Sequence, residues 1–77
     1  MTNAQLPPDV QELPTAARWI YRLLERNGGE LSISAIREHT GLTVRGIRKA
    51  VVDLEESDLA TSHWSTDDAR ERIIRLQ

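Results

Sequence analysis

Cysteine is absent from this sequence of 77 residues, which excludes disulfide bonds and thiolate metal sites as supplements to the hydrophobic core. The two histidines, His39 and His63, lie far apart with no ligand spacing around them, so we expect no metal site. The longest apolar runs, 19–21 and 50–52, contain three residues each. Such runs are too short for a transmembrane helix or a signal-peptide core, and we expect a cytoplasmic protein without a membrane partner.

The sequence also lacks an excess of either charge. Twelve acidic and ten basic residues give a formal net charge of −2, which by itself argues weakly against a nucleic-acid-binding protein. Asp9 and Glu12 precede residue 13, so residues 13–77 carry ten charges of each sign. Nine of the ten bases are arginines, whose guanidinium groups suit contacts to phosphate and guanine. The positions of the charges therefore matter more than their sum.

The residue patterns of an enzyme are missing too. The sequence has no glycine-rich phosphate loop, no nucleophile with a plausible base, and no carboxylate pair that can be placed in a cleft. A single domain of this length also offers little room for a substrate pocket. We therefore expect a binding module that is not an enzyme, with no cofactor and no small-molecule ligand.

The pattern of residues predicts a short arm followed by one domain. Residues 1–12 contain adjacent prolines and few large apolar side chains, and we expect a flexible arm there. Residues 13–77 are expected to form the domain. Its first helix is predicted over roughly 14–27, where apolar residues recur on one face before the glycines at 28–29 supply a left-handed stop.

Two further helices are predicted over roughly 33–39 and 44–56, separated by a tight break at 40–42. Ser32 and Thr43 immediately precede them and are good N-cap residues. A short strand is expected at 30–32, and the remainder reads as a hairpin of two strands, 59–64 and 70–76. The core predicted from this periodicity contains Ile20, Leu23, Leu24, Leu31, Ile36, Ile47, Val51, Leu54, Leu59, Ile74 and Leu76.

Two short helices joined by a tight turn that contains glycine are typical of the helix-turn-helix, and the added hairpin gives a winged helix. Residues 31–76 resemble the DNA-binding domain of the multiple antibiotic resistance regulator (MarR) family. The matching residues are Ser32, Ile36, Thr40-Gly41-Leu42-Thr43, Leu54-Glu55, Leu59 and Asp68-Ala69-Arg70. The resemblance implies an α+β, mainly α, winged helix-turn-helix of three helices plus a C-terminal β-hairpin wing. It also implies sequence-specific binding of double-stranded DNA, with helix 44–56 in the major groove and the 64–72 wing in the minor groove.

The sequence departs from the family pattern at three places. Asp58 stands where the family has a glycine, and aspartate tolerates the left-handed conformation needed there. Val44 occupies a position that is often basic. The terminal dimerisation helices of the family, and the ligand pocket between them, are largely absent, so effector sensing of that kind is not expected.

Helix 44–56 carries opposite charges in its two halves. Arg45, Arg48 and Lys49 lie in the first half, on the face opposite the apolar residues, and acidic residues follow from Asp53 onward. Cations near a helix N-terminus are mildly unfavourable with the helix dipole, which favours a functional interpretation over a solvated face. The candidate DNA-binding residues are Ser34, Thr43, Val44, Arg45, Arg48, Lys49, Arg70 and Arg72. The resemblance implies that Arg70 points into a minor groove, paired with Asp68 across the wing turn. The alternative is an ordinary charged hairpin tip with no role in binding.

Three features leave alternatives open. Gly46 costs helix propensity, which is explained either by close approach of DNA or by packing against the preceding helix. Trp64 either packs on the inner face of the hairpin or is an exposed anchor for a partner. The first helix has more large apolar groups than one buried face can use, which predicts a weak homodimer through Trp19 or Tyr21.

The sequence thus predicts a small transcriptional regulator that binds double-stranded DNA. The alternative is a winged-helix module for protein–protein contacts within a larger assembly, an interpretation that the near-zero charge of the domain favours. Salt dependence of DNA binding distinguishes the two.

Overall fold

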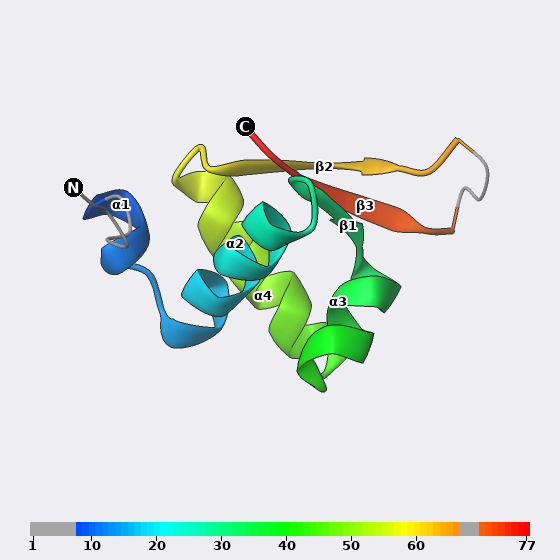
Figure 1. The fold of residues 1–77 in the computed structure, drawn as a ribbon, viewed down its shortest axis with the longest axis horizontal. Helices are drawn as coiled ribbons and strands as arrows, with labels where there is room; N and C mark the ends of the chain where they lie inside the picture. Colours follow the sequence, from blue (N-terminus) through cyan, green and yellow to red (C-terminus); the bar gives the residue numbers. More distant parts are fainter. Residues whose placement is uncertain (1–7, 67–69) are drawn as a thin grey trace.

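The computed structural model describes residues 8–66 and 70–77. Over these residues the chain forms four helices and three strands in the order α1 (Pro8–Gln11), α2 (Thr15–Arg26), β1 (Glu30–Ser32), α3 (Ile33–Thr40), α4 (Val44–Glu56), β2 (Ala60–Trp64) and β3 (Arg72–Leu76). The three longer helices lie on one side of the sheet, and the loop end of the hairpin extends beyond them (Figure 1). The predicted winged helix, with its three main helices and C-terminal wing, is confirmed.

The helix starts follow from local capping, as predicted. The Ser32 hydroxyl accepts a hydrogen bond from the Ala35 amide at 3.0 Å, and the Thr43 hydroxyl accepts one from the Gly46 amide at 3.0 Å. Each bond satisfies one of the amides that a helix N-terminus leaves without an internal partner. The α3–α4 turn depends on Gly41, whose φ of 72° lies in the left-handed region. The Thr43 cap fixes where α4 begins and therefore which of its residues point outward.

Asp58 also takes a left-handed conformation, with a φ of 59°. It is the one residue other than glycine with a positive φ among those described, and it stands where the chain turns from α4 toward β2. Aspartate visits this conformation at a modest cost because its short side chain bonds locally. The turn expected at the position of the family's glycine therefore forms.

The three strands form one antiparallel sheet in the order β1-β3-β2. In the hairpin Ala60 pairs with Leu76 at one end and Trp64 pairs with Arg72 at the other. The hairpin strands are shorter than predicted at their starts, beginning at Ala60 and Arg72. The short strand at Glu30–Ser32 is present and pairs with β3.

The core lies between the helices and the sheet. Seven of the predicted core positions are buried or nearly so, and Leu23, Leu31, Leu59 and Leu76 pack against them while partly exposed. The prediction omitted Val10, Ala17, Ala50 and Ala60, all of which are buried.

Val10 belongs to the segment predicted as a flexible arm. It is fully buried, and α1 packs against α2. The part of the arm over Pro8–Gln11 is therefore a packed helical turn, while residues 1–7 lie outside the described part of the chain.

Candidate nucleic-acid interface

The first half of α4 presents a basic surface. Ile47, Ala50, Val51 and Leu54 are buried on one side of the helix, which leaves Arg45, Arg48 and Lys49 exposed on the other. Thr43 is exposed at the cap and Val44 is half-buried beside it. No acidic residue occupies the first turn of α4 and no basic residue occupies its last turn, so the charges oppose the helix dipole at both ends. Each such charge costs about 0.3–1 kcal/mol of helix stability.

The three basic side chains are not equivalent. Lys49 Nζ lies 3.7 Å from the Asp53 carboxylate one turn further along, and its side chain is 76% exposed. An exposed pair of this kind is worth little and breaks easily. Within residues 8–66 and 70–77, Arg45 and Arg48 have no acidic partner within ion-pair distance. These two guanidinium groups are thus available to an anionic ligand.

Gly46 has a local explanation. A Cβ built on it would lie 3.2 Å from the Thr43 hydroxyl oxygen, the atom that accepts the Gly46 amide hydrogen. A larger residue would therefore crowd the cap that starts α4. Of the two explanations raised by the sequence, packing against α3 is wrong, because no α3 atom lies within 4 Å of that Cβ.

A hollow on this face gathers side chains from α3, α4 and the wing. It has a volume of about 130 Å³ and is lined by Ile33, Ser34, Arg48, Trp64, Arg70, Glu71 and Arg72. Four of the eight candidate residues, Ser34, Arg48, Arg70 and Arg72, therefore lie together although they come from three parts of the chain. Three arginines against one glutamate make the hollow electropositive.

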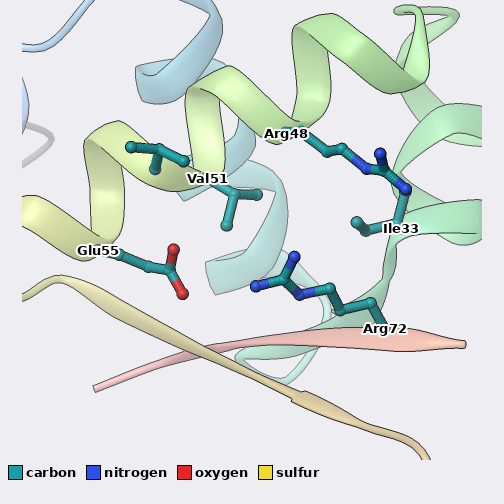
Figure 2. Close-up of a pocket in the computed structure, with 6 residues that line it drawn as sticks. Ile33, Arg48, Val51, Glu55 and Arg72 are labelled. Atoms are coloured by element: carbon teal, nitrogen blue, oxygen red, sulfur yellow. The ribbon is translucent and has the colours of Figure 1, made fainter. Parts of the chain in front are cut away.

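A second hollow of about 200 Å³ adjoins the first, because Ile33, Arg48 and Arg72 line both. Val51, Val52 and Glu55 form its remaining wall. Figure 2 shows Arg48 extending from α4 toward Ile33 and Arg72 extending from β3 toward Val51 and Glu55, so that the two arginines border the hollow from opposite sides. The basic face of α4 and the root of the wing are thus parts of one surface.

A hydrogen-bonded chain joins the wing to α4. The Ser62 hydroxyl donates to Glu55 Oε2 at 2.8 Å and accepts from the Arg72 guanidinium at 2.9 Å. The same guanidinium lies 5.9 Å from the centre of the Trp64 ring, within the range of a cation–π contact. Arg72 is half-buried and held by these neighbours, and the side chain of Arg70 is exposed. Both arginines are DNA-binding candidates predicted from the sequence, with a specific role for Arg70 alone, and neither Ser62 nor Glu55 is among the predicted site residues.

The wing differs from prediction at Trp64. Its side chain is 58% exposed, so the alternative in which it packs closely on the inner face is wrong. The other alternative, an anchor for a partner, agrees with this exposure and stays a prediction. The expected pair between Asp68 and Arg70 cannot be placed, because Asp68 lies outside the described residues.

The two aromatic residues predicted for the outer side of α2 differ in how exposed they are. Trp19 is 46% exposed, whereas Tyr21 packs against the core and is half-buried. Burial raises the pKa of the Tyr21 phenol, and the nearby Glu25 carboxylate raises it further. Of the two residues predicted for the self-association surface, Tyr21 is therefore the more covered.

No helix in the described ranges is both long and apolar enough to cross a membrane. In the same ranges, no three acidic or histidine side chains gather as a metal site would need.

Comparison with known proteins establishes the fold. No family model and no curated protein matches the sequence. Among solved structures, the YusO protein from Bacillus subtilis is 22% identical with a TM-score of 0.78, covering 87% of this chain and 47% of its own. The adhesin competence repressor AdcR from Streptococcus pyogenes is 22% identical with a TM-score of 0.75, covering 87% of this chain and 48% of its own.

A MepR-like protein complexed with pseudoligands is 20% identical with a TM-score of 0.77, covering 90% of this chain and 49% of its own. This chain spans about half the length of these neighbours. They are MarR-family winged-helix regulators, and at this identity the likeness concerns the fold. The predicted resemblance to the MarR-type winged helix is confirmed in that sense.

Proposed function

We propose that this chain binds double-stranded DNA as a small transcriptional regulator. In this proposal α4 enters the major groove and the wing, residues 64–72, contacts the adjacent minor groove. The observation that carries it is the single electropositive surface formed by the exposed first half of α4 and the hollow lined by Ser34, Arg48, Arg70 and Arg72. The N-terminal half of a recognition helix is the part that meets base edges.

The charge arrangement of α4 supports this role. Bases at its start and acids at its end are each unfavourable with the helix dipole, although Glu55 accepts a hydrogen bond from Ser62 and Asp53 lies 3.7 Å from Lys49. A polyanion on the basic half offsets the cost at the start of α4. The near-zero charge of the whole domain is compatible with binding because the charges are segregated along one helix.

Roles for the individual residues follow from their positions. Arg48 lies about one turn into α4, is exposed, and is suited to bidentate contact with guanine. Arg45 and Lys49 flank it on the same face, and the exposed hydroxyls of Ser34 and Thr43 suit phosphate contacts. Val44 contributes an apolar contact at the start of the helix.

The test compares wild type with Arg48→Ala on labelled duplexes enriched from a random pool by the wild-type protein. The loss expected is about 1–3 kcal/mol of binding free energy, with relaxed preference at one base position. Arg75→Ala is the matched control, because Arg75 is exposed on β3 next to Ile74 and therefore lies on the opposite sheet face. Equal affinity for both variants, or binding that ignores salt, would show that this face does not bind DNA.

Symmetric DNA sites are normally bound by dimers, and we propose weak self-association through the outer side of α2. Trp19 supports this proposal because it is 46% exposed, whereas Tyr21 is largely committed to the core. Sedimentation at high micromolar concentration should show dimers that Trp19→Ala abolishes. A wild-type monomer with and without DNA would refute the proposal.

The second candidate function is a protein-interaction module in a larger assembly. Exposed apolar side chains on two different elements, Trp19 on α2 and Val52 on α4, favour it. It becomes the preferred function if the wild-type protein fails to bind any duplex at low salt.

A further inference from the structure

The side chains of β2 lie on two faces of the sheet, and the position of Trp64 among them extends the proposed function. Side chains alternate between the two faces of a strand, so Ala60, Ser62 and Trp64 share one face. Their cross-strand partners are Leu76, Ile74 and Arg72 respectively. Ala60 and Ile74 are buried, which identifies this face as the one that packs on the helices. Trp64 therefore stands on the core-facing side of the sheet, at the last residue of β2, and is nevertheless 58% exposed.

An indole in that position is costly unless something covers it. Trp64 is 58% exposed and is the most exposed large hydrophobic residue in the described part of the chain. A tryptophan presents a large apolar surface with a single N–H donor, a combination that is enriched at interfaces. The position thus calls for a partner that meets both the apolar ring and the donor.

The indole is also held in place. The Arg72 guanidinium lies 5.9 Å from the ring centre, and its hydrogen bond to Ser62 connects it to Glu55 on α4. A ring whose neighbour is itself anchored loses less conformational entropy on binding than a free one. Trp64 is therefore pre-oriented relative to the basic face of α4.

The surroundings of the ring favour a polyanion over a protein. Ser34, Arg48, Arg70 and Arg72 line the same hollow as Trp64, and Glu71 is the only acid among its lining residues. DNA offers phosphates to these cations and apolar deoxyribose faces to the ring. Arg48 joins this hollow to the face of α4 that meets the major groove in the proposed function.

We propose that Trp64 is a DNA-contacting residue, packing its indole on the sugar–phosphate wall of the groove beside the wing. Arg72 is a positioning residue in this arrangement, holding the ring while Arg48 and Arg70 meet phosphates or bases. The proposal rests on the DNA-binding function proposed above and assigns it a contact that does not depend on charge.

Fluorescence tests the contact directly, because the sequence has two tryptophans. In Trp19→Phe, Trp64 is the sole tryptophan, and a duplex of about two helical turns should change its emission and protect it from acrylamide. In Trp64→Phe, Trp19 is the remaining tryptophan and lies on the proposed self-association surface. A response of Trp19 that also appears on raising the protein concentration without DNA therefore reports dimerisation and not a DNA contact. Unchanged quenching of Trp64 at saturating DNA overturns the proposal.

Affinity measurements separate this contact from the charged ones. Trp64→Ala should weaken duplex binding about five- to tenfold, in line with aromatic contacts to nucleic acids, and Trp64→Phe should weaken it less. The slope of log affinity against log salt should stay at the wild-type value, because no charge is lost. Arg48→Ala should instead reduce that slope by about one.

His63→Ala is the control, since His63 lies on the opposite face of the same strand and is exposed. It should bind like wild type, and all variants should melt at the same temperature.

The outcomes distinguish this inference from the function on which it rests. A wild-type protein that binds no duplex refutes the proposed function and the inference together. A wild-type protein that binds normally, with Trp64→Ala equal to it in affinity, overturns the inference alone. Protection of Trp64 that increases with protein concentration in the absence of DNA also overturns it, and identifies a second copy of this chain as the partner.

Discussion

The two ends of the β2–β3 hairpin have the same side-chain alternation but different surroundings. At one end Ala60 pairs with Leu76 beneath the helices and is 2% exposed; at the other Trp64 pairs with Arg72 and is 58% exposed. The covered end contributes apolar burial, and the uncovered end contributes arginines and an aromatic ring to the candidate interface. In the proposed function the hairpin therefore serves stability at one end and binding at the other, and mutations should separate the two properties.

The largest effect is expected at the covered end. Ile74→Ala removes a fully buried side chain from the centre of the sheet and should lower the free energy of unfolding by about 2–5 kcal/mol. Urea titration followed by circular dichroism measures it. Ile73→Ala is the control, because Ile73 is the same residue type one position away on the partly exposed face. An equal loss in both variants would contradict the assignment of the core-facing side.

The uncovered end should behave in the opposite way. Arg70→Ala removes an exposed cation, so the unfolding free energy should change by less than about 0.5 kcal/mol. Duplex affinity should fall and the salt slope should decrease by about one phosphate contact, with little change in major-groove preference. Titration of labelled duplex at two salt concentrations measures both. A stability loss without an affinity loss would assign Arg70 to the fold.

A smaller effect is expected at Ser62, which lies on β2 between the two ends of the hairpin. Ser62→Ala breaks the hydrogen bonds to Glu55 and Arg72, which should cost about 0.5–1.5 kcal/mol of unfolding free energy. Duplex binding should also weaken, because Arg72 no longer holds Trp64 against the basic face. Thr61→Ala, on the exposed face of β2, provides the comparison and should change neither property. Wild-type binding by Ser62→Ala would show that the chain of hydrogen bonds serves stability alone.

The smallest effect is a pH dependence of the unfolding free energy. It arises at Tyr21 on α2, which packs against the core that covers one end of the hairpin. The pKa of Tyr21 is raised above its ordinary value of 10.0, chiefly by burial, so the folded state holds the phenolic proton more tightly than the unfolded state. That stabilisation is complete below pH 10.0 and is lost as the pH rises through the pKa of the folded state. Unfolding free energy should therefore fall more steeply above this pH in wild type than in Tyr21→Phe. Parallel curves of unfolding free energy against pH for the two proteins would contradict this prediction.

The sequence was most informative where structure depends on neighbouring residues. Ser32 and Thr43 were predicted as caps because an N-cap bond spans three residues, and α4 was predicted with its observed bounds. Large apolar residues at helical spacing gave most of the core. Ala17, Ala50 and Ala60 were missed because alanine is buried where two elements approach closely, which requires knowledge of the packing.

The interface was predicted less completely for a related reason. Arg45, Arg48 and Lys49 follow from the helical period alone. The connection of Glu55, Ser62 and Arg72 depends on the register of the sheet against α4, which no local pattern encodes. The exposure of Trp64 depends on where the helices stop covering the hairpin, a property of the assembled layers.

The strand order has a consequence for how the chain folds. β3 follows every other element in sequence, yet it is the middle strand, and β1 and β2 each pair with it and not with each other. Helices form from local contacts, whereas pairing Glu30 with Arg75 requires closing a loop that includes α3, α4 and β2. During synthesis the helical part can collapse early, but no strand ladder exists until β3 emerges. Completion of the wing and completion of the sheet are therefore one late event, and the candidate interface gains Arg72 and its partners only at that step.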